Sequence, residues 1–195
     1  MRAMTRLGAA VALLALVGWT RAHAQNPQTR HGFWIGFGFG GGSARLSCNG
    51  CGDTTITAAT GHIKLGGTLR PNLLIGGEVN AWSRPKENGE KFTLGNVSAI
   101  VQYYPAPANG FFLKGGLGVA TAEDNSDVDG KFTGTGFGFI FGLGYDIRVA
   151  RNFSLTPIAN LYWGGIGELS QGGSTSSGLG WKQSVIEVGL DFMFH

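Results

Sequence analysis

Hydrophobic and polar residues alternate along most of this chain, and the alternation is clearest in the last segment, 180–194. From residue 186 onward every second residue is apolar, and the residues between are acidic, glycine or methionine. The apolar set is Ile186, Val188, Leu190, Phe192 and Phe194. A strict period of two is typical of a β-strand with one apolar face and one polar face. The segment therefore predicts a closing strand with two unlike faces.

The same period recurs upstream and predicts eight strands in all. The expected strands run over about 32–44, 56–69, 73–83, 92–104, 111–121, 136–146, 153–164 and 180–194. Short turns follow the second, fourth and sixth strands, whereas longer polar loops follow the others, including 84–91, 122–131 and 165–178. Bacterial transmembrane barrels have an even strand number, short periplasmic turns and longer outside loops. We therefore expect an all-β, eight-stranded antiparallel up-and-down barrel.

The polar faces of these strands indicate which way the barrel points. Opposite the aromatic residues of the segments 32–44 and 136–146 lies mostly glycine, which gains nothing by facing water but relieves crowding inside a narrow barrel. The remaining charged residues of this face are Lys64, Glu78, Lys114, Asp146, Glu187 and Asp191. Charge on a lipid-facing surface is costly. The pattern favours a transmembrane barrel with a polar interior over a soluble barrel of the lipocalin type, in which the apolar face would point inward.

The first 24 residues have the features of a cleaved secretory signal peptide. Arg2 and Arg6 precede an apolar run over 7–19, and the small-x-small pattern at 22–24 offers a cleavage site. Thirteen apolar residues are too few for a membrane-spanning helix, which needs about 20. We expect residues 1–24 to be the signal peptide and residues 25–195 to be one barrel domain.

Removal of this leader changes the charge of the chain. Arg2, Arg6 and Arg21 leave with it, so 12 of the 15 basic residues remain beside all 12 acidic ones. A neutral chain without a basic run offers no electrostatic argument for nucleic-acid binding. Glycine is abundant, at 35 of 195 residues, but it follows no collagen period and is accompanied by many aromatic residues.

The two cysteines, Cys48 and Cys51, follow the first predicted strand. In an exported protein a disulfide that closes this small ring is the favoured state. A haem site would need histidine at position 52, where glycine stands, and a zinc site would need two more ligands. A redox site would need a βαβ context. We expect no cofactor and no metal.

The segment from Gly142 to Ile147, the turn residues 151–152 and the segment from Ser154 to Pro157 resemble the penultimate hairpin of the outer-membrane β-barrel domain family. That family includes opacity-type and other small eight-stranded surface proteins. The resemblance implies a place in the bacterial outer membrane, with its lipid around the barrel. It further implies delivery by periplasmic chaperones and insertion by the barrel assembly machinery, which would read the terminal strand 186–194.

The interior charges allow two interpretations. Paired with one another they would plug the barrel, and hydrated they would line a pore for ions or small solutes. Eight strands leave almost no lumen, which favours the plug. The expected role is then structural or surface-interacting, with four outside loops available to an extracellular ligand. The alternative is a narrow channel or a transporter of small hydrophobic solutes.

An enzymatic role has less support. Barrel enzymes that modify lipid exist, but a serine hydrolase needs serine, histidine and an acid within reach of one another. Only His62 lies within a predicted strand, and no serine has the spacing of a barrel deacylase around it. The acidic run Glu123, Asp124, Asp127 and Asp129 lacks the final glutamate of a calcium loop. We expect no enzyme and a solvated acidic loop.

Overall fold

The computed structural model describes residues 28–48, 53–86, 90–126, 130–171 and 174–195. Every regular element among them is a β-strand. The strands are β1 (Phe33–Ser47), β2 (Thr54–Arg70), β3 (Leu73–Pro85), β4 (Lys91–Tyr103), β5 (Phe111–Ser126), β6 (Gly130–Tyr145), β7 (Ile147–Ala150), β8 (Phe153–Gln171) and β9 (Ser174–Phe194). No helix within the described residues is long and apolar enough to span a membrane.

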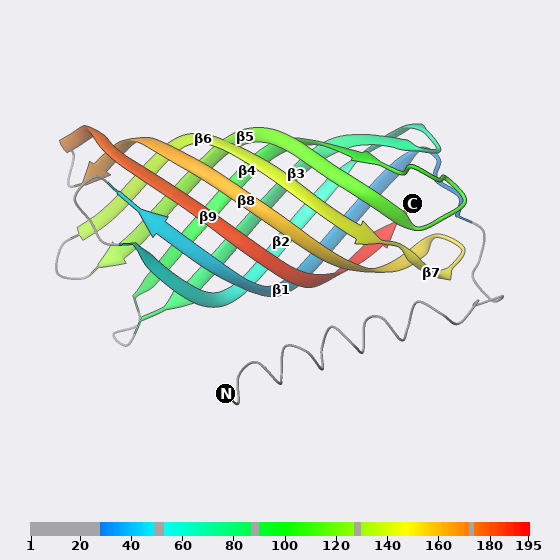
Figure 1. Cartoon of the computed structure of the whole chain (residues 1–195), viewed down its shortest axis with the longest axis horizontal. Coiled ribbons are helices and arrows are strands. Elements are labelled where there is room, and N and C mark those ends of the chain that lie inside the picture. The colour runs from blue at the N-terminus through cyan, green and yellow to red at the C-terminus, as the bar shows by residue number, and fades with distance from the viewer. Residues whose placement is uncertain (1–27, 49–52, 87–89, 127–129, 172–173) are drawn as a thin grey trace.

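The strands form one closed antiparallel barrel (Figure 1). Strands that are consecutive along the chain pair with each other, except β6 and β7, and β1 pairs with β9 to close the sheet. The short β7 continues β6 after a break at Asp146, and both pair with β8. The two therefore act as one strand of the barrel wall, and the prediction of an eight-stranded antiparallel barrel is confirmed.

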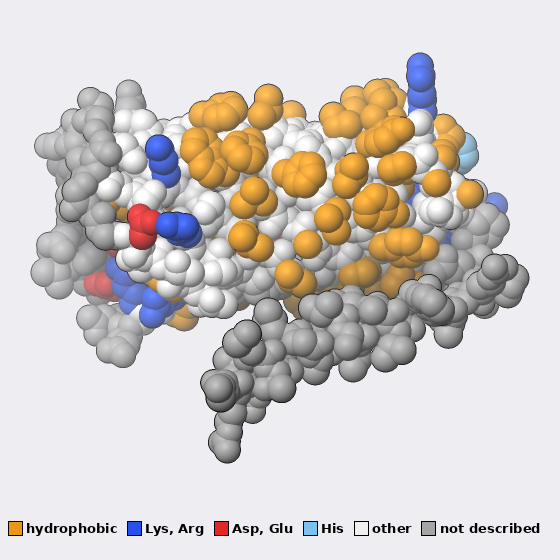
Figure 2. Space-filling model, viewed as in Figure 1, with side chains coloured by type: hydrophobic (Ala, Val, Ile, Leu, Met, Phe, Trp, Pro, Cys, Tyr) orange, Lys and Arg blue, Asp and Glu red, His pale blue; other side chains and the backbone are white. Residues whose placement is uncertain are grey.

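The two faces of the wall differ as the alternation predicts. Large apolar side chains cover the outside in a band around the middle of the barrel, with charged side chains toward its ends (Figure 2). On β1, for example, Phe33 and Phe39 are 62% and 60% exposed, whereas Trp34 between them is 1% exposed. Such an outer band can lie against hydrocarbon only in a closed barrel, because an open sheet edge would leave backbone groups unpaired there.

Glycine makes room inside the barrel for large side chains. A Cβ added to Gly66 or Gly76 would lie 2.7 or 2.8 Å from the ring of Trp34, closer than real contacts allow. The two glycines are cross-strand partners on β2 and β3, so together they leave the space that the indole fills. The predicted role of inward glycine in relieving crowding is thus seen directly at Trp34.

The three short turns agree with prediction, but two of the expected long loops do not exist in that form. The acidic segment 122–131 was expected to be a loop, yet β5 continues to Ser126 and β6 begins at Gly130. Likewise β8 continues to Gln171 and β9 begins at Ser174, within the expected loop 165–178. Backbone pairing continues to the ends of these strands, since Gln171 pairs with Ser174 and Ser126 with Gly130.

Aromatic residues near the strand ends divide between the two faces. Tyr103 and Tyr145 are 45% and 40% exposed on the outside, as a membrane-interface girdle requires. Trp82, Tyr104 and Tyr162 instead point inward and are at most 5% exposed. These three therefore belong to the interior rather than to a girdle.

Candidate functional site in the barrel interior

The side chains of the six predicted interior charges all point into the barrel. Lys64, Glu78, Lys114, Asp146, Glu187 and Asp191 are all at most 2% exposed. They come from β2, β3, β5, the break before β7, and β9, so the cluster exists only once the barrel has closed. Charges buried in this way must be paired or hydrated, because an isolated buried charge is very costly.

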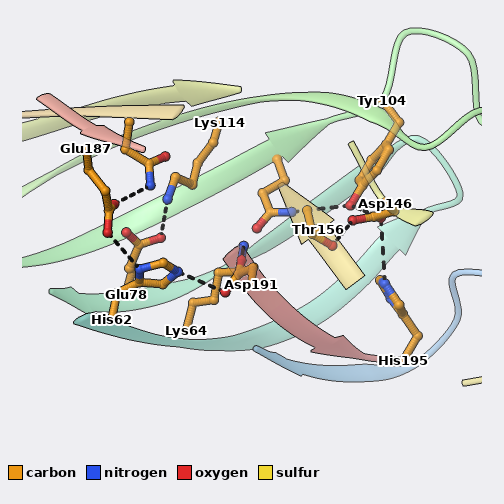
Figure 3. Close-up of polar contacts among 12 residues, drawn as sticks. His62, Lys64, Glu78, Tyr104, Lys114, Asp146, Thr156, Glu187, Asp191 and His195 are labelled. Carbon is orange, nitrogen blue, oxygen red and sulfur yellow. Dashed lines mark hydrogen bonds and ion pairs between the residues drawn. The ribbon is translucent and has the colours of Figure 1, made fainter. Parts of the chain in front are cut away.

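Five of the six predicted residues meet in the middle of the barrel with His62, and Figure 3 shows these six side chains together. With Asn160 and Tyr162, which bond to Glu187, they form what we call the central cluster: His62, Lys64, Glu78, Lys114, Asn160, Tyr162, Glu187 and Asp191. Lys64 Nζ lies 2.5 Å from Asp191 Oδ2, and Lys114 Nζ lies 2.6 Å from Glu78 Oε2. Both predicted lysines are thus ion-paired across the lumen, each with a predicted carboxylate.

His62 stands between the two carboxylates of β9. Its Nε2 lies 2.9 Å from Asp191 Oδ1, and its Nδ1 lies 3.6 Å from Glu187 Oε1. The cluster holds three carboxylates and two ammonium groups, so an imidazolium at His62 would complete its neutrality. His62 therefore forms one hydrogen bond, through Nε2 to Asp191, and a longer electrostatic contact through Nδ1 with Glu187.

Neutral side chains of β8 complete the central cluster. The Tyr162 hydroxyl donates to Glu187 Oε2 at 2.5 Å, and Asn160 Nδ2 donates to the same oxygen at 2.7 Å. Tyr162 also lies 3.4 Å from Glu78 Oε1. Tyr162 thus links the Glu187 side of the cluster to the ion pair of Glu78 and Lys114.

The sixth predicted residue, Asp146, lies apart from the central cluster, at the end of the barrel that carries the short turns. Its Oδ1 accepts from Thr156 Oγ1 at 2.9 Å, and its Oδ2 accepts from Tyr104 at 2.9 Å and from Arg30 at 3.3 Å. We call Arg30, Tyr104, Asp146, Thr156 and His195 the periplasmic cluster, since short turns face the periplasm in such barrels.

Arg30 and His195 close this end of the barrel from outside the strands. The Arg30 guanidinium lies 3.5 Å from the centre of the Tyr104 ring and donates to the carbonyls of Pro107 and Asn109 at 2.9 and 3.1 Å. His195 Nε2 lies 4.0 Å from Asp146 Oδ2. Burial, reinforced by Arg148 and Arg30, lowers the pKa of His195 to about 3, so the ring is neutral at ordinary pH.

Sequence reasoning missed several members of these clusters. Arg30 precedes the first strand and His195 follows the last, so no alternation points to either of them. Tyr104 carried a usable signal, because it stands two residues beyond the inward Gln102. Because inward and outward residues alternate along β4, this spacing alone could have placed the Tyr104 ring inside the barrel.

Almost no free space remains in the lumen beside the central cluster. The cavity lined there by Thr60, Asn80, Trp82, Asn96 and Tyr162, among others, has a volume of about 10 Å³. This is room for about one water molecule. The interior at this level is filled by side chains.

The terminal strand is placed as its alternation predicts. Ile186, Val188 and Phe194 are 63%, 66% and 40% exposed on the outside, and Leu190 and Phe192 lie on the same face. The ring of Phe192 stacks on Phe37 with centroids 5.4 Å apart, across the β1–β9 seam. The outer face of β9 thus contacts the surroundings of the barrel, and through Phe192 it also packs across the seam that closes the barrel.

Other sequence predictions fall partly outside the described residues. The proposed disulfide partner of Cys48 is Cys51, which is not among them, and the same holds for the signal peptide 1–24. Of the acidic run, Glu123 and Asp124 lie on β5, whereas Asp127 and Asp129 are outside the described residues. Within the described parts of the chain no group of three histidine, cysteine or acidic side chains could hold a metal ion.

A closed barrel with an apolar outer band and a charged, paired interior is the architecture of an outer-membrane β-barrel protein. The profile of the outer membrane protein beta-barrel domain family matches residues 9–194. The chain belongs to this family, and its place is the bacterial outer membrane.

Solved structures of other outer-membrane barrels share the fold. Neisserial surface protein A matches with a TM-score of 0.55 and 16% identity, covering 85% of this chain and 98% of its own. Ail, the attachment invasion locus protein of Yersinia pestis, matches with a TM-score of 0.52 and 14% identity, covering 85% of this chain and 100% of its own. A search of curated proteins found no significant match. At these identities the likeness concerns the fold alone.

Proposed function

We propose that this protein is a plugged, non-enzymatic outer-membrane barrel whose role lies at its extracellular end. The filled interior beside the central cluster carries this proposal. A pore for ions or small solutes needs a continuous hydrated path. The interior instead holds paired charges, and the cavity that Tyr162 of the central cluster helps to line has a volume of only about 10 Å³. The ion pairs then serve to seal and stabilise the barrel.

Its surface role rests on the connections that follow β1, β3, β5 and β8. The described ends of these strands lie at the end of the barrel opposite the short turns, which is the outside in barrels of this kind (Figure 1). The Cys48–Cys51 disulfide belongs to the first of them in this proposal. An extracellular ligand would meet these connections, while outer-membrane lipid surrounds the band and the assembly machinery and periplasmic chaperones deliver the chain.

Planar-bilayer recording tests the plug. Folded protein, verified by its heat-dependent gel mobility, is inserted at known density and held at a range of voltages. The proposal expects no steady conductance above the bare bilayer. Reproducible unitary current steps that scale with the amount of folded protein would contradict it and favour the narrow-channel alternative.

A further inference from the structure

The extracellular mouth of the barrel has an apolar lining above the polar interior. Its inward positions carry Leu46, Ile56, Ala58, Phe92, Phe132 and Trp181, which are partly buried and pack against the core. These side chains face the lumen, not the lipid, because they share the inward register of their strands. An apolar lining that opens toward water is unusual at a purely solvated barrel end.

Part of this lining surrounds a pocket, the mouth pocket, with a volume of about 480 Å³. Its apolar wall is formed by Leu46, Ile56, Phe92 and Trp181. Phe92 packs edge-on against Trp82, with ring centroids 6.0 Å apart, and the buried Trp82 indole is fixed by its hydrogen bond to the Gly42 carbonyl at 2.9 Å. Trp82 also lines the cavity of about 10 Å³, so it connects the Phe92 wall of the mouth pocket to the filled interior.

The charged wall of the mouth pocket is formed by Arg84, Lys86 and Asp124. Lys86 Nζ lies 2.6 Å from Asp124 and 3.6 Å from Glu90, and the hydrogen bond to Asp124 raises the pKa of Lys86. Arg84 also lines the pocket and is exposed, and no ion pair engages it among the described residues. Arg84 is therefore the cation of this wall whose guanidinium is open to an anion.

The register places this cation beside the aromatic wall. Arg84 on β3 is the cross-strand partner of Phe92 on β4, and Phe92 is in turn the partner of Asp124 on β5. Of these three cross-strand partners, Asp124 is already ion-paired with Lys86. Arg84 and the Phe92 ring remain as adjacent polar and apolar anchors.

We propose that the mouth pocket binds a small monocarboxylate with an aromatic or aliphatic body. The apolar body lies against Phe92 and Trp181, and the carboxylate accepts from the Arg84 guanidinium, whose planar fork matches two carboxylate oxygens. The volume lies within the roughly 300–1,000 Å³ of small-molecule sites. This inference rests on the proposed function, because Trp82 connects the Phe92 wall of the pocket to the filled interior.

Fluorine NMR tests the binding with the intact barrel. The protein is labelled with 5-fluorotryptophan and folded in zwitterionic micelles, and the Trp181 resonance is assigned from its loss in Trp181→Phe. The probe is 1-naphthoate, and its neutral counterpart is 1-naphthalenemethanol. We expect naphthoate to shift the Trp181 resonance saturably and with at least about fivefold higher affinity than the alcohol, while the Trp34 resonance stays in place.

Two arginine variants separate the pocket from general charge at the barrel end. Arg84→Gln should weaken naphthoate binding about tenfold, as expected for the loss of one charge-assisted contact. Arg45→Gln removes an exposed arginine that pairs with Asp53 and does not line the pocket, and it should leave the affinity unchanged. Heat-dependent gel mobility verifies that each variant is folded.

Three results would overturn the inference: no saturable shift of Trp181, equal affinity for the acid and the alcohol, or equal effects of the two arginine variants. A shift common to all tryptophans would mark partition into the micelle and would also overturn it. The outcome is separable from that of the bilayer experiment. A silent barrel that binds no naphthoate contradicts only this inference, and a conducting barrel that binds it contradicts only the plug.

Discussion

Asp191 joins two strands of the barrel interior through two side-chain contacts. Its two carboxylate oxygens contact His62 at 2.9 Å and Lys64 at 2.5 Å. Both partners come from β2, so Asp191 ties the inward face of β2 to β9 across the intervening strand β1. Removing one member of a buried pair is more damaging than replacing the whole pair, because the remaining charge stays buried.

We therefore expect Asp191→Asn to lower the free energy of unfolding by about 3–5 kcal/mol, the range for a buried ion left without its partner. The measurement is urea unfolding of the vesicle-inserted protein followed by tryptophan fluorescence. Asp53→Asn is the matched control, since Asp53 pairs with Arg45 in an exposed position, and its unfolding should match the parent protein. Equal effects of the two substitutions would mean that the interior pair is hydrated.

Gly38 tests how closely the central cluster is packed. A Cβ at Gly38 would lie 2.6 Å from Asp191 Oδ1 and 2.7 Å from His62 Cε1, whereas a Cβ at Gly41 on the outer face meets nothing within 4 Å. Gly38→Ala should cost about 1–3 kcal/mol of stability, as overpacking does. Gly41→Ala should be neutral or slightly stabilising. A loose interior would instead show the same unfolding midpoint for both variants.

His195 predicts a pH effect at the periplasmic end. Burial lowers its pKa to about 3 in the folded protein, against about 6.5 when unfolded. The unfolded chain therefore binds the proton first, so this residue's contribution to stability is complete above pH 6.5 and is lost as the pH falls toward 3. The loss approaches about 1.4 kcal/mol per pH unit between the two values.

Comparison of the parent protein with His195→Gln isolates that contribution. Unfolding free energies measured from pH 7 to pH 4 should fall more steeply for the parent, and the two curves should diverge as the pH is lowered. Parallel curves would show that His195 is hydrated in the folded barrel.

At the level of the strands, the outward face of β9 is set by hydrocarbon. Leu190 lies at the middle of the apolar face 186–194, opposite Phe39 of β1. Leu190→Lys should cost about 2–4 kcal/mol, the range for a lysine at the membrane midplane, whereas Thr57→Lys near the extracellular end should cost about 0–1 kcal/mol. Vesicle unfolding measures both. Similar costs at the two depths would place the apolar band elsewhere.

The strands also show what the sequence could predict and what it could not. Alternation identified every barrel strand, and the inward face of all but the strand at 153–164, because hydrocarbon outside and a crowded polar interior impose opposite chemistry on neighbouring residues. It failed beyond the membrane, at 122–131 and 165–178, where β5, β6, β8 and β9 continue. There neither face meets lipid, so backbone pairing maintains the strand and the period of two disappears from the sequence.

The same limit applies to the interior. Parity identified Lys64, Glu78 and Asp191 as inward, but it could not say that Lys64 pairs with Asp191. Lys64 and Glu78 are cross-strand partners in register, which alone would predict that these two pair with each other. The observed pairing depends on reach across the lumen, which follows from the closure and stagger of the whole barrel.

Considered as a whole, the molecule has different chemistry at three depths, and in the proposed function it is a sealed barrel. The periplasmic cluster closes one end, the central cluster fills the middle, and apolar side chains line the extracellular mouth. The seal follows from strand number, since an eight-stranded barrel has an interior just wide enough for side chains to fill. The plugged interior is therefore the central claim of the proposed function.

The most direct test of that claim is proton NMR of the histidine rings in the membrane-embedded protein labelled with ¹⁵N-histidine. His62 lies within the plug, 2.9 Å from Asp191, and His31 is exposed outside the barrel wall. The account predicts a persistent imidazole N–H resonance that disappears in His62→Gln, and none from His31, whose proton exchanges with water. Absence of the His62 resonance in a folded barrel would show a water-filled lumen and contradict the account.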